Sequence, residues 1–308
     1  MKPLRETGVS GKSLSLKDAL ILYKQDYLPS RNYAQRTRVE YINDLNQLAR
    51  FFAKSKIFNL NQVSRKNLER FLAYLDQKGY AGQTRRRKTA SIHSLFSFLY
   101  HDGYSSINIS FGLIPPRAES KEPRVLSEEE YKVLLRTCSY SARDTAIIEL
   151  FLQTGIRLSE LVNLKLQDIS LPARIGKQPE NIGMMKIKGG KGRKDRTLPL
   201  NYKVCRALKA YLKIRPEIEG KSIFINKFGR PLGPRGVQIM VKKHMQECGI
   251  EGATVHSLRH TFGTHHIAKG TSLRSVQEAL GHTDLKTTSI YISLSRTMMN
   301  KELQENAL

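Results

Sequence analysis

The most informative segment of the sequence is His256-Ser-Leu-Arg259-His260-Thr261, and Leu280-Gly281-His282 and Ile290-Tyr291 follow it downstream. The surrounding pattern predicts helices, with these polar residues at helix ends or turns. His256 and His260 are four residues apart, a spacing that also suits two metal ligands on one helix face. No Glu follows His256, and no nearby Cys or carboxylate offers a third ligand, so the sequence predicts no metal site and no cofactor.

Two more polar segments precede this stretch: Thr154-Gly-Ile-Arg157-Leu-Ser-Glu160-Leu and Gly190-Lys191-Gly192. The first follows a buried-looking helix that Gly155 ends. The second lies between short β-compatible runs, 184–188 and 196–200, and is typical of a hairpin turn. Each segment alone has an ordinary interpretation: a surface arginine, a plain hairpin, and at Tyr291 a half-buried core ring.

The first part of the chain predicts helices over residues 14–27, 34–53, from Ser64 to just before Gly79, and 83–101. Residues 105–124 contain three prolines and few periodic apolar residues, as in an interdomain linker. We therefore expect a helical domain over 13–104, a linker over 105–124, and a second domain over 125–308. The fold class is mainly α, with a small antiparallel β-sheet (α+β) in the second domain.

The 52 Lys and Arg residues outnumber the 27 Asp and Glu residues, which gives a formal net charge of +25. The excess is spread over both domains, which favours a protein that surrounds a polyanion rather than one with a basic tail. An anionic membrane surface would also attract this charge, but no apolar run is long enough to span a bilayer. The three cysteines are widely spaced and fit a reducing cytoplasm.

The order Arg, Lys, His-x-x-Arg, His, Tyr behind a basic helical domain resembles the tyrosine recombinases, the integrase family. Within that family it is most similar to Xer-type and transposon-borne resolvases and integrases. The resemblance implies a site-specific recombinase that cleaves and rejoins duplex DNA through a covalent 3′-phosphotyrosyl intermediate, without metal or ATP. It also implies a SAM-like, four-helix core-binding domain over 13–104. The task could be chromosome-dimer resolution, transposon resolution, or integration and excision.

The residue types fit this chemistry. Two arginines, Arg157 and Arg259, suit a clamp on a phosphate that gains negative charge during cleavage. Tyr291 is the candidate nucleophile, and its phenol needs cations or a base to ionise at neutral pH. The resemblance implies four further roles: Lys191 as general acid for the 5′-oxygen, with Lys188 as its rival; His256 in proton exchange with Tyr291; His282 as a hydrogen-bond donor to phosphate; and Glu160 in support.

The expected partner is a duplex DNA recombination site, bound by a homotetramer across two sites. The C-terminal segment 296–308 is a candidate contact between protomers, and an accessory protein or second recombinase could take part. We expect backbone contacts from Arg36, Arg38, Arg85, Arg86, Arg87, Lys88, Lys188, Arg193 and Lys194. The expected location is the cytoplasm, at the nucleoid. Two alternatives are a type IB topoisomerase-like enzyme and a non-catalytic architectural DNA-binding protein.

Overall fold

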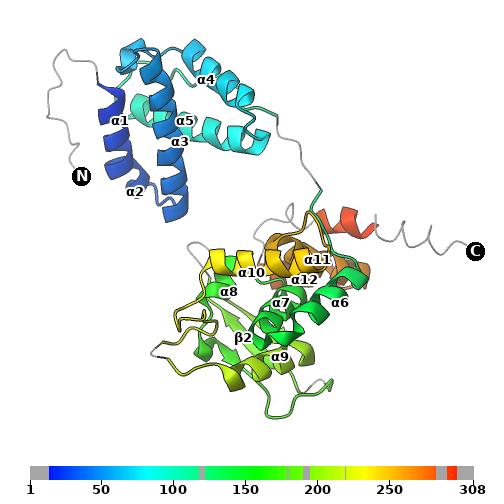
Figure 1. Cartoon of the computed structure of the whole chain (residues 1–308). Helices are drawn as coiled ribbons and strands as arrows, with labels where there is room; N and C mark the ends of the chain where they lie inside the picture. Colours follow the sequence, from blue (N-terminus) through cyan, green and yellow to red (C-terminus); the bar gives the residue numbers. More distant parts are fainter. Residues whose placement is uncertain are drawn as a thin grey trace, which may run out of the picture. The chain divides into compact units, whose positions relative to one another are not determined.

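The computed structural model describes residues 14–117, 122–178, 180–189, 195–218, 220–281 and 290–296. The chain divides into two compact units, Met1–Lys121 and Glu122–Leu308, each with its own hydrophobic core. The predicted class is confirmed, since both units are mostly helical and the second holds one small antiparallel sheet. Figure 1 shows the elements of each unit.

The first unit consists of four helical runs. The first comprises α1 (Leu16–Leu22), a π-helical turn (Tyr23–Tyr27) and α2 (Leu28–Ser30); then come α3 (Gln35–Lys54), a 3₁₀ turn (Leu60–Gln62), α4 (Arg65–Gln77) and α5 (Gly82–His101). Ser64 begins α4 as expected, because its hydroxyl accepts a hydrogen bond from the Asn67 amide. The apolar faces meet in a core that includes Tyr23, Phe52 and Phe71.

The predicted linker begins later than residue 105. Ile109 and Leu113 pack against the core of the first unit, and Ser110 is fully buried. Both ring nitrogens of His93, on α5, hold this segment: Nδ1 lies 3.2 Å from the Ser110 hydroxyl and Nε2 lies 3.1 Å from the Leu113 carbonyl. The prolines that suggested a linker lie beyond this anchored stretch, so residues 105–113 extend the helical unit.

The second unit is built around α7 (Ala142–Thr154), which is buried along most of its length and packs against α9 and α11. Its other helices are α6 (Glu128–Thr137), α8 (Leu158–Asn163), α9 (Tyr202–Ile214), α10 (Pro234–Glu247), α11 (Val255–Ala268) and α12 (Leu273–Leu280), with 3₁₀ turns at Cys138–Tyr140 and Leu166–Asp168. A capping box is present at α6, where Ser127 and Glu130 bond each other's backbone amides. Residues 290–296 are also helical.

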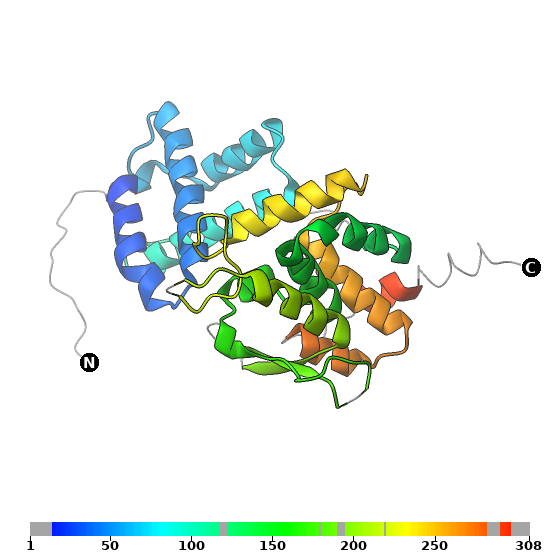
Figure 2. The same ribbon diagram turned by 60° about the horizontal axis from the view of Figure 1, so that its bottom comes forward.

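The sheet has the order β1 (Ile169–Ser170), β2 (Gly183–Ile187), β3 (Arg196–Leu200), and all its pairs are antiparallel. The hairpin predicted from the sequence is β2–β3, with Gly183 opposite Leu200 and Ile187 opposite Arg196. Met185, Ile187 and Leu198 turn toward the core. Figure 2 shows the sheet at the lower edge of the second unit, and a hydrogen bond from Arg196 to the Ala279 carbonyl joins it to α12.

Candidate active site

Arg157 stands at the start of α8, directly after the turn that ends α7. Gly155 makes this turn with a left-handed φ of +60°, and a Cβ there would lie within 2.6 Å of Phe262 and Leu280. The Arg157 side chain is 18% exposed. Its Nη1 donates to Glu160 Oε1 at 3.0 Å and its Nη2 donates to the Gly281 carbonyl at 2.7 Å. Glycine is therefore required for the tight turn that presents this arginine.

Arg259 lies on α11 and is 7% exposed. Its guanidinium donates to the Gly155 carbonyl at the end of α7 and, at 2.8 Å, to the Leu280 carbonyl at the end of α12. Both acceptors lie at helix C-termini, where the helix dipole favours a cation. Burial and repulsion from Arg157 lower the pKa of Arg259 to about 10. At neutral pH both arginines therefore remain charged beside one another.

Tyr291 is 1% exposed and packs against α11. Burial raises the pKa of its phenol, while Arg259 and Arg157 act in the opposite direction, Arg259 also through a hydrogen bond. The expected arginine pair and tyrosine are therefore brought together. In this arrangement, however, the phenol lies in the core and not at the surface.

The two histidines of the segment 256–261, His256 and His260, have different surroundings. His256 is exposed on the first turn of α11 and lines a small groove with Arg235, Gln238 and Lys242 of α10. His260 is largely enclosed, its ring centroid lies 5.7 Å from that of Tyr291, and its Nδ1 has no hydrogen-bond partner. Burial, and then the charges of His256 and Arg259, lower the pKa of His260 to about 4, so it is neutral at pH 7. His260 is therefore a neutral ring that packs beside Tyr291.

Glu160 accepts hydrogen bonds from two arginines. It binds Arg157 and also Arg196, whose Nη1 and Nη2 reach its two oxygens at 2.9 and 2.8 Å. Sequence reasoning missed Arg196. The available signal was its place at the end of a basic turn, two residues beyond Lys194, on the first residue of an expected strand.

Several predicted residues of the second unit are not tested by this geometry. Lys188 is exposed and its Nζ lies 3.8 Å from Asp168 Oδ1. Four residues lie outside the described part of the chain: Lys191, Arg193, Lys194 and His282. The tail segment 297–308 also lies outside it.

The basic run of the first unit is more strongly paired than expected. Lys88 is 6% exposed, and its ammonium binds Asp44 and Gln47 at 2.7 Å each. This placement does not fit a direct phosphate contact, because the amine would have to leave a buried carboxylate. Arg87 also binds Asp44, and Arg85 binds Asp76.

Other predicted contacts of this unit remain at its surface. Arg36 and Arg86 are exposed, and Arg38 is half-buried with its Nε on the Tyr33 carbonyl.

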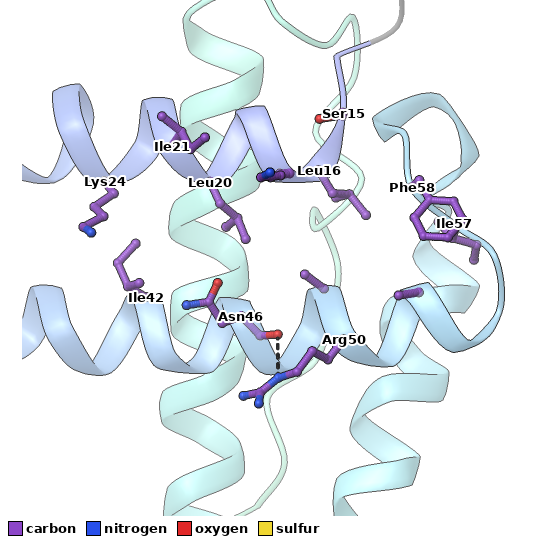
Figure 3. Close-up of a pocket in the computed structure, with 13 residues that line it drawn as sticks. Ser15, Leu16, Leu20, Ile21, Lys24, Ile42, Asn46, Arg50, Ile57 and Phe58 are labelled. Carbon is purple, nitrogen blue, oxygen red and sulfur yellow. Dashed lines mark hydrogen bonds between the residues drawn. The ribbon is translucent and has the colours of Figure 1, made fainter.

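The first unit has a groove of its own. It has a volume of about 840 Å³ and runs between α1 and α3 of the first unit. Leu16, Leu20 and Ile42 line it, and Lys24 and Arg50 lie at its edge (Figure 3). In the described ranges, no cluster of three or more His, Cys, Asp or Glu side chains could hold a metal ion. No helix there is long and apolar enough to cross a bilayer.

Comparison with known proteins covers both units. The phage integrase family model matches residues 124–298, and the model of the phage integrase N-terminal SAM-like domain matches residues 20–103. Tyrosine recombinase XerC of Natranaerobius thermophilus is 34% identical over 300 residues, which is 93% of this chain and 97% of that protein.

Two solved structures have the same fold. The XerH recombinase bound to a palindromic difH substrate after cleavage superposes with a TM-score of 0.74 at 21% identity, covering 96% of this chain and 98% of that one. A lambda integrase tetramer bound to a Holliday junction also gives a TM-score of 0.74, at 19% identity, covering 92% and 78% of the two chains.

Proposed function

Since this chain belongs to the phage integrase family of tyrosine recombinases, we infer that it is a site-specific DNA recombinase that cuts and rejoins duplex DNA. The observation that carries this inference is the meeting of Arg157, Arg259 and Tyr291 at the ends of α7 and α12. A topoisomerase-like enzyme would share the chemistry but not the similarity to XerC along 93% of the chain. An architectural DNA-binding protein would leave the buried Arg259 and the adjacent, partly buried Arg157 without a purpose.

We propose that Arg157 and Arg259 bind the non-bridging oxygens of one scissile phosphate. Each guanidinium is oriented by carbonyls at helix ends, so little reorganisation is needed when negative charge develops in the transition state. Both are held by side-chain-to-backbone bonds that a lysine could not reproduce, because an ammonium lacks the planar fork. Phosphate binding by this clamp therefore requires both the positive charge and the planar geometry of the two guanidinium groups.

The proposed reaction exchanges one phosphoester for another. The Tyr291 oxygen attacks phosphorus, its bond to phosphorus forms as the bond to the 5′-oxygen breaks, and the phenolic proton is lost as the 5′-oxygen gains one. The 3′-phosphotyrosyl ester keeps the energy of the broken bond. A second 5′-hydroxyl can therefore reverse the step without ATP, and the joined strand and free Tyr291 result.

Proton transfer is assigned to the remaining motif residues. We propose His256 for exchange with the Tyr291 oxygen, because it is an exposed imidazole on the same helix as Arg259. Lys191 is the proposed acid for the 5′-oxygen, and His282 the proposed hydrogen-bond donor to the phosphate. The proposal for Glu160 is indirect: its carboxylate binds Arg157 and Arg196 and so orients the clamp.

Assembly follows from the same analogy. Lambda integrase has been seen as a tetramer on a Holliday junction. We propose that four copies of this chain likewise join two DNA sites, with segment 296–308 as a contact between protomers and with room for an accessory protein or second recombinase. Because DNA is the substrate, a cytoplasmic, nucleoid-associated location is part of the proposal.

Covalent capture tests this function and identifies the DNA site. Purified protein is incubated with fragmented genomic DNA of its host, the reaction is stopped with detergent, and the DNA attached to protein is sequenced. We expect one recurring sequence in the attached DNA, and no attachment by the Tyr291→Phe variant. Tyr131→Phe is the matched control, since Tyr131 also lies against α11, at His265, but outside the proposed chemistry. Attachment by Tyr291→Phe would refute the assignment of the nucleophile.

Relaxation of a supercoiled plasmid separates the two enzymatic alternatives. A plasmid without the captured sequence should remain supercoiled in the presence of this protein. Efficient relaxation of that plasmid would instead favour the topoisomerase-like alternative.

A further inference from the structure

Arg196 makes three hydrogen bonds inside the second unit, although it begins a short strand at the edge of the sheet. Its side chain is 14% exposed. Nη1 and Nη2 donate to the two oxygens of Glu160 at 2.9 and 2.8 Å, and Nε donates to the Ala279 carbonyl at 3.0 Å. All three bonds come from one planar guanidinium, so together they fix the orientation of its plane. Three of its five N–H groups are therefore committed to the protein.

Glu160, which Arg196 holds in place, also binds Arg157. Oε1 accepts from Arg157 Nη1 at 3.0 Å as well as from Arg196, and Oε2 accepts from the Arg157 backbone amide at 2.9 Å. Each carboxylate oxygen therefore holds one group of Arg157 and one of Arg196. A rotation of the carboxylate would break bonds to both arginines, so the position of Arg157 depends on how Arg196 holds Glu160.

The end of α12 joins Arg196 to both clamp arginines. The carbonyls of its last residues and cap, Ala279, Leu280 and Gly281, accept hydrogen bonds from Arg196, Arg259 and Arg157 in that order. Gly281 is the cap, and a Cβ there would lie 2.8 Å from Arg196 Nη1 and 3.2 Å from Arg157 Nη1. Three cations thus share one helix C-terminus, where the dipole offsets part of their repulsion.

We propose that Arg196 is a positioning residue for DNA cleavage: it holds Glu160 and the end of α12 so that Arg157 faces the scissile phosphate correctly. This role rests on the proposed function of Arg157 and Tyr291. It deepens that function by assigning a residue that need not touch DNA. Lysine at position 196 would keep the charge but could not bind both carboxylate oxygens and the Ala279 carbonyl in one plane.

The test separates cleavage from binding. A nicked duplex bearing the captured sequence is the probe, the adduct rate is measured at saturating protein, and the dissociation constant is measured by fluorescence anisotropy. Arg196→Lys should slow adduct formation on the order of 10- to 100-fold, as expected for a misplaced catalytic group. Its dissociation constant should stay within about twofold, because the charge is retained.

The matched control is Arg143→Lys. Arg143 also binds a carboxylate, Asp144, and a carbonyl, that of Ile225, in the same unit. The Arg143→Lys variant should cleave DNA at the same rate as the natural protein. If Arg196→Lys melts well below this control, Glu160→Asp takes its place as the probe variant, since a shorter carboxylate cannot hold both arginines. It should show the same selective loss of rate.

A double variant tests whether the effect passes through Glu160. In a Glu160→Gln background, Arg196→Lys should slow cleavage by less than about threefold more, because coupled residues are not additive. The proposal would be overturned if Arg196→Lys slowed cleavage equally in the natural and the Glu160→Gln backgrounds. It would also be overturned if Arg196→Lys left the cleavage rate unchanged, or if its loss of rate were matched by weaker DNA binding. If Tyr291→Phe still forms adducts, the proposed function fails instead; if it forms none while Arg196→Lys is fully active, only the positioning role fails.

Discussion

Gly263 of α11 lies directly against the ring of Tyr291, and a Cβ built on Gly263 would stand 2.8 to 2.9 Å from three of its ring atoms. Real Cβ atoms do not approach carbon so closely, so the buried position of Tyr291 requires glycine at 263. A glycine in the interior of a helix is otherwise unfavourable. Gly263 therefore has a low helix propensity within α11, but it leaves the space in which Tyr291 packs beside Arg259.

Gly263→Ala should therefore displace Tyr291 and destabilise the protein by about 1–3 kcal/mol, the usual result of overpacking a core. Urea unfolding at neutral pH measures the loss, and nitration of tyrosine followed by mass spectrometry measures the exposure of Tyr291. In a Tyr291→Ala background the clash is gone, and the same change should stabilise by roughly 0.5–1 kcal/mol, the helix preference for alanine. Equal destabilisation in both backgrounds would contradict the role given to the ring.

His260 gives the unfolding free energy a pH dependence between pH 6.5 and 4. Its pKa falls from 6.5 to about 4 on folding, with burial as the main cause. Between these two pH values the unfolded chain binds a proton on this imidazole and the folded chain does not. The contribution of neutral His260 to the unfolding free energy is therefore full above pH 6.5 and is lost as pH falls through 4.

A His260→Phe variant should lose less stability than the natural chain between pH 7 and pH 4.5. The phenylalanine ring also lacks Nδ1, the buried nitrogen of His260 that has no hydrogen-bond partner. Urea titrations at the two pH values give the comparison. Parallel losses in the two proteins would show that His260 does not resist protonation.

Local patterns in the sequence predicted most of the fold. The helix-ending glycine at 155 and the two runs of the hairpin are encoded within a few residues, and each appears where expected. The two-residue strand β1 was not predicted, since so short a segment has no measurable period. The first unit extends to Leu113 because of packing against α5, which composition does not encode.

The site was predictable only where its residues lie in compact motifs. Arg157 and Arg259 stand in such motifs, but Arg196 meets Glu160 across 36 residues, a distance at which no spacing rule operates. The buried position of Lys88 did have a signal. It precedes Ile92 by four residues and Leu95 by seven, which places it on the apolar face of α5. A prediction from charge alone therefore misses the position of Lys88 on the buried face of the helix.

Lys88 and Arg86 should therefore respond differently to substitution, although both belong to the same basic run. Lys88→Ala removes a cation from the buried Asp44 carboxylate and should cost roughly 3–5 kcal/mol of unfolding free energy, less any part that Arg87 makes up. Arg86→Ala at the exposed surface should leave stability unchanged.

DNA binding should show the reverse order for the two variants. Arg86→Ala should lower the slope of log affinity against log salt by about 1, as for one lost phosphate contact. Any folded Lys88 variant should keep the natural slope. Anisotropy titrations at several salt concentrations measure this, and a reduced slope for a stably folded Lys88→Met variant would restore Lys88 as a phosphate contact.

Glu160 should stabilise the folded protein at neutral pH and lose this effect in acid. Burial alone would raise the pKa of its carboxyl, but hydrogen bonds from Arg196 and from the Arg157 amide, together with the Arg196 charge, outweigh burial and lower it from 4.5 to about 2. A depressed carboxyl pKa stabilises fully above the unfolded value of 4.5, and this contribution disappears as pH falls through 2. The maximum linked effect is roughly 3 kcal/mol.

The Glu160→Gln variant isolates this contribution from that of the other carboxyls. At pH 7 it should be clearly less stable than the natural chain, because Arg157 and Arg196 lose the charge between them. The difference in unfolding free energy should shrink steadily between pH 4.5 and pH 2, as the natural carboxylate takes up its proton. Glu69→Gln is the control, since its ion pair with Arg65 is half exposed and should contribute little at any pH. A difference for Glu160→Gln that stays constant down to pH 2 would mean that the carboxylate is not held by its two arginines.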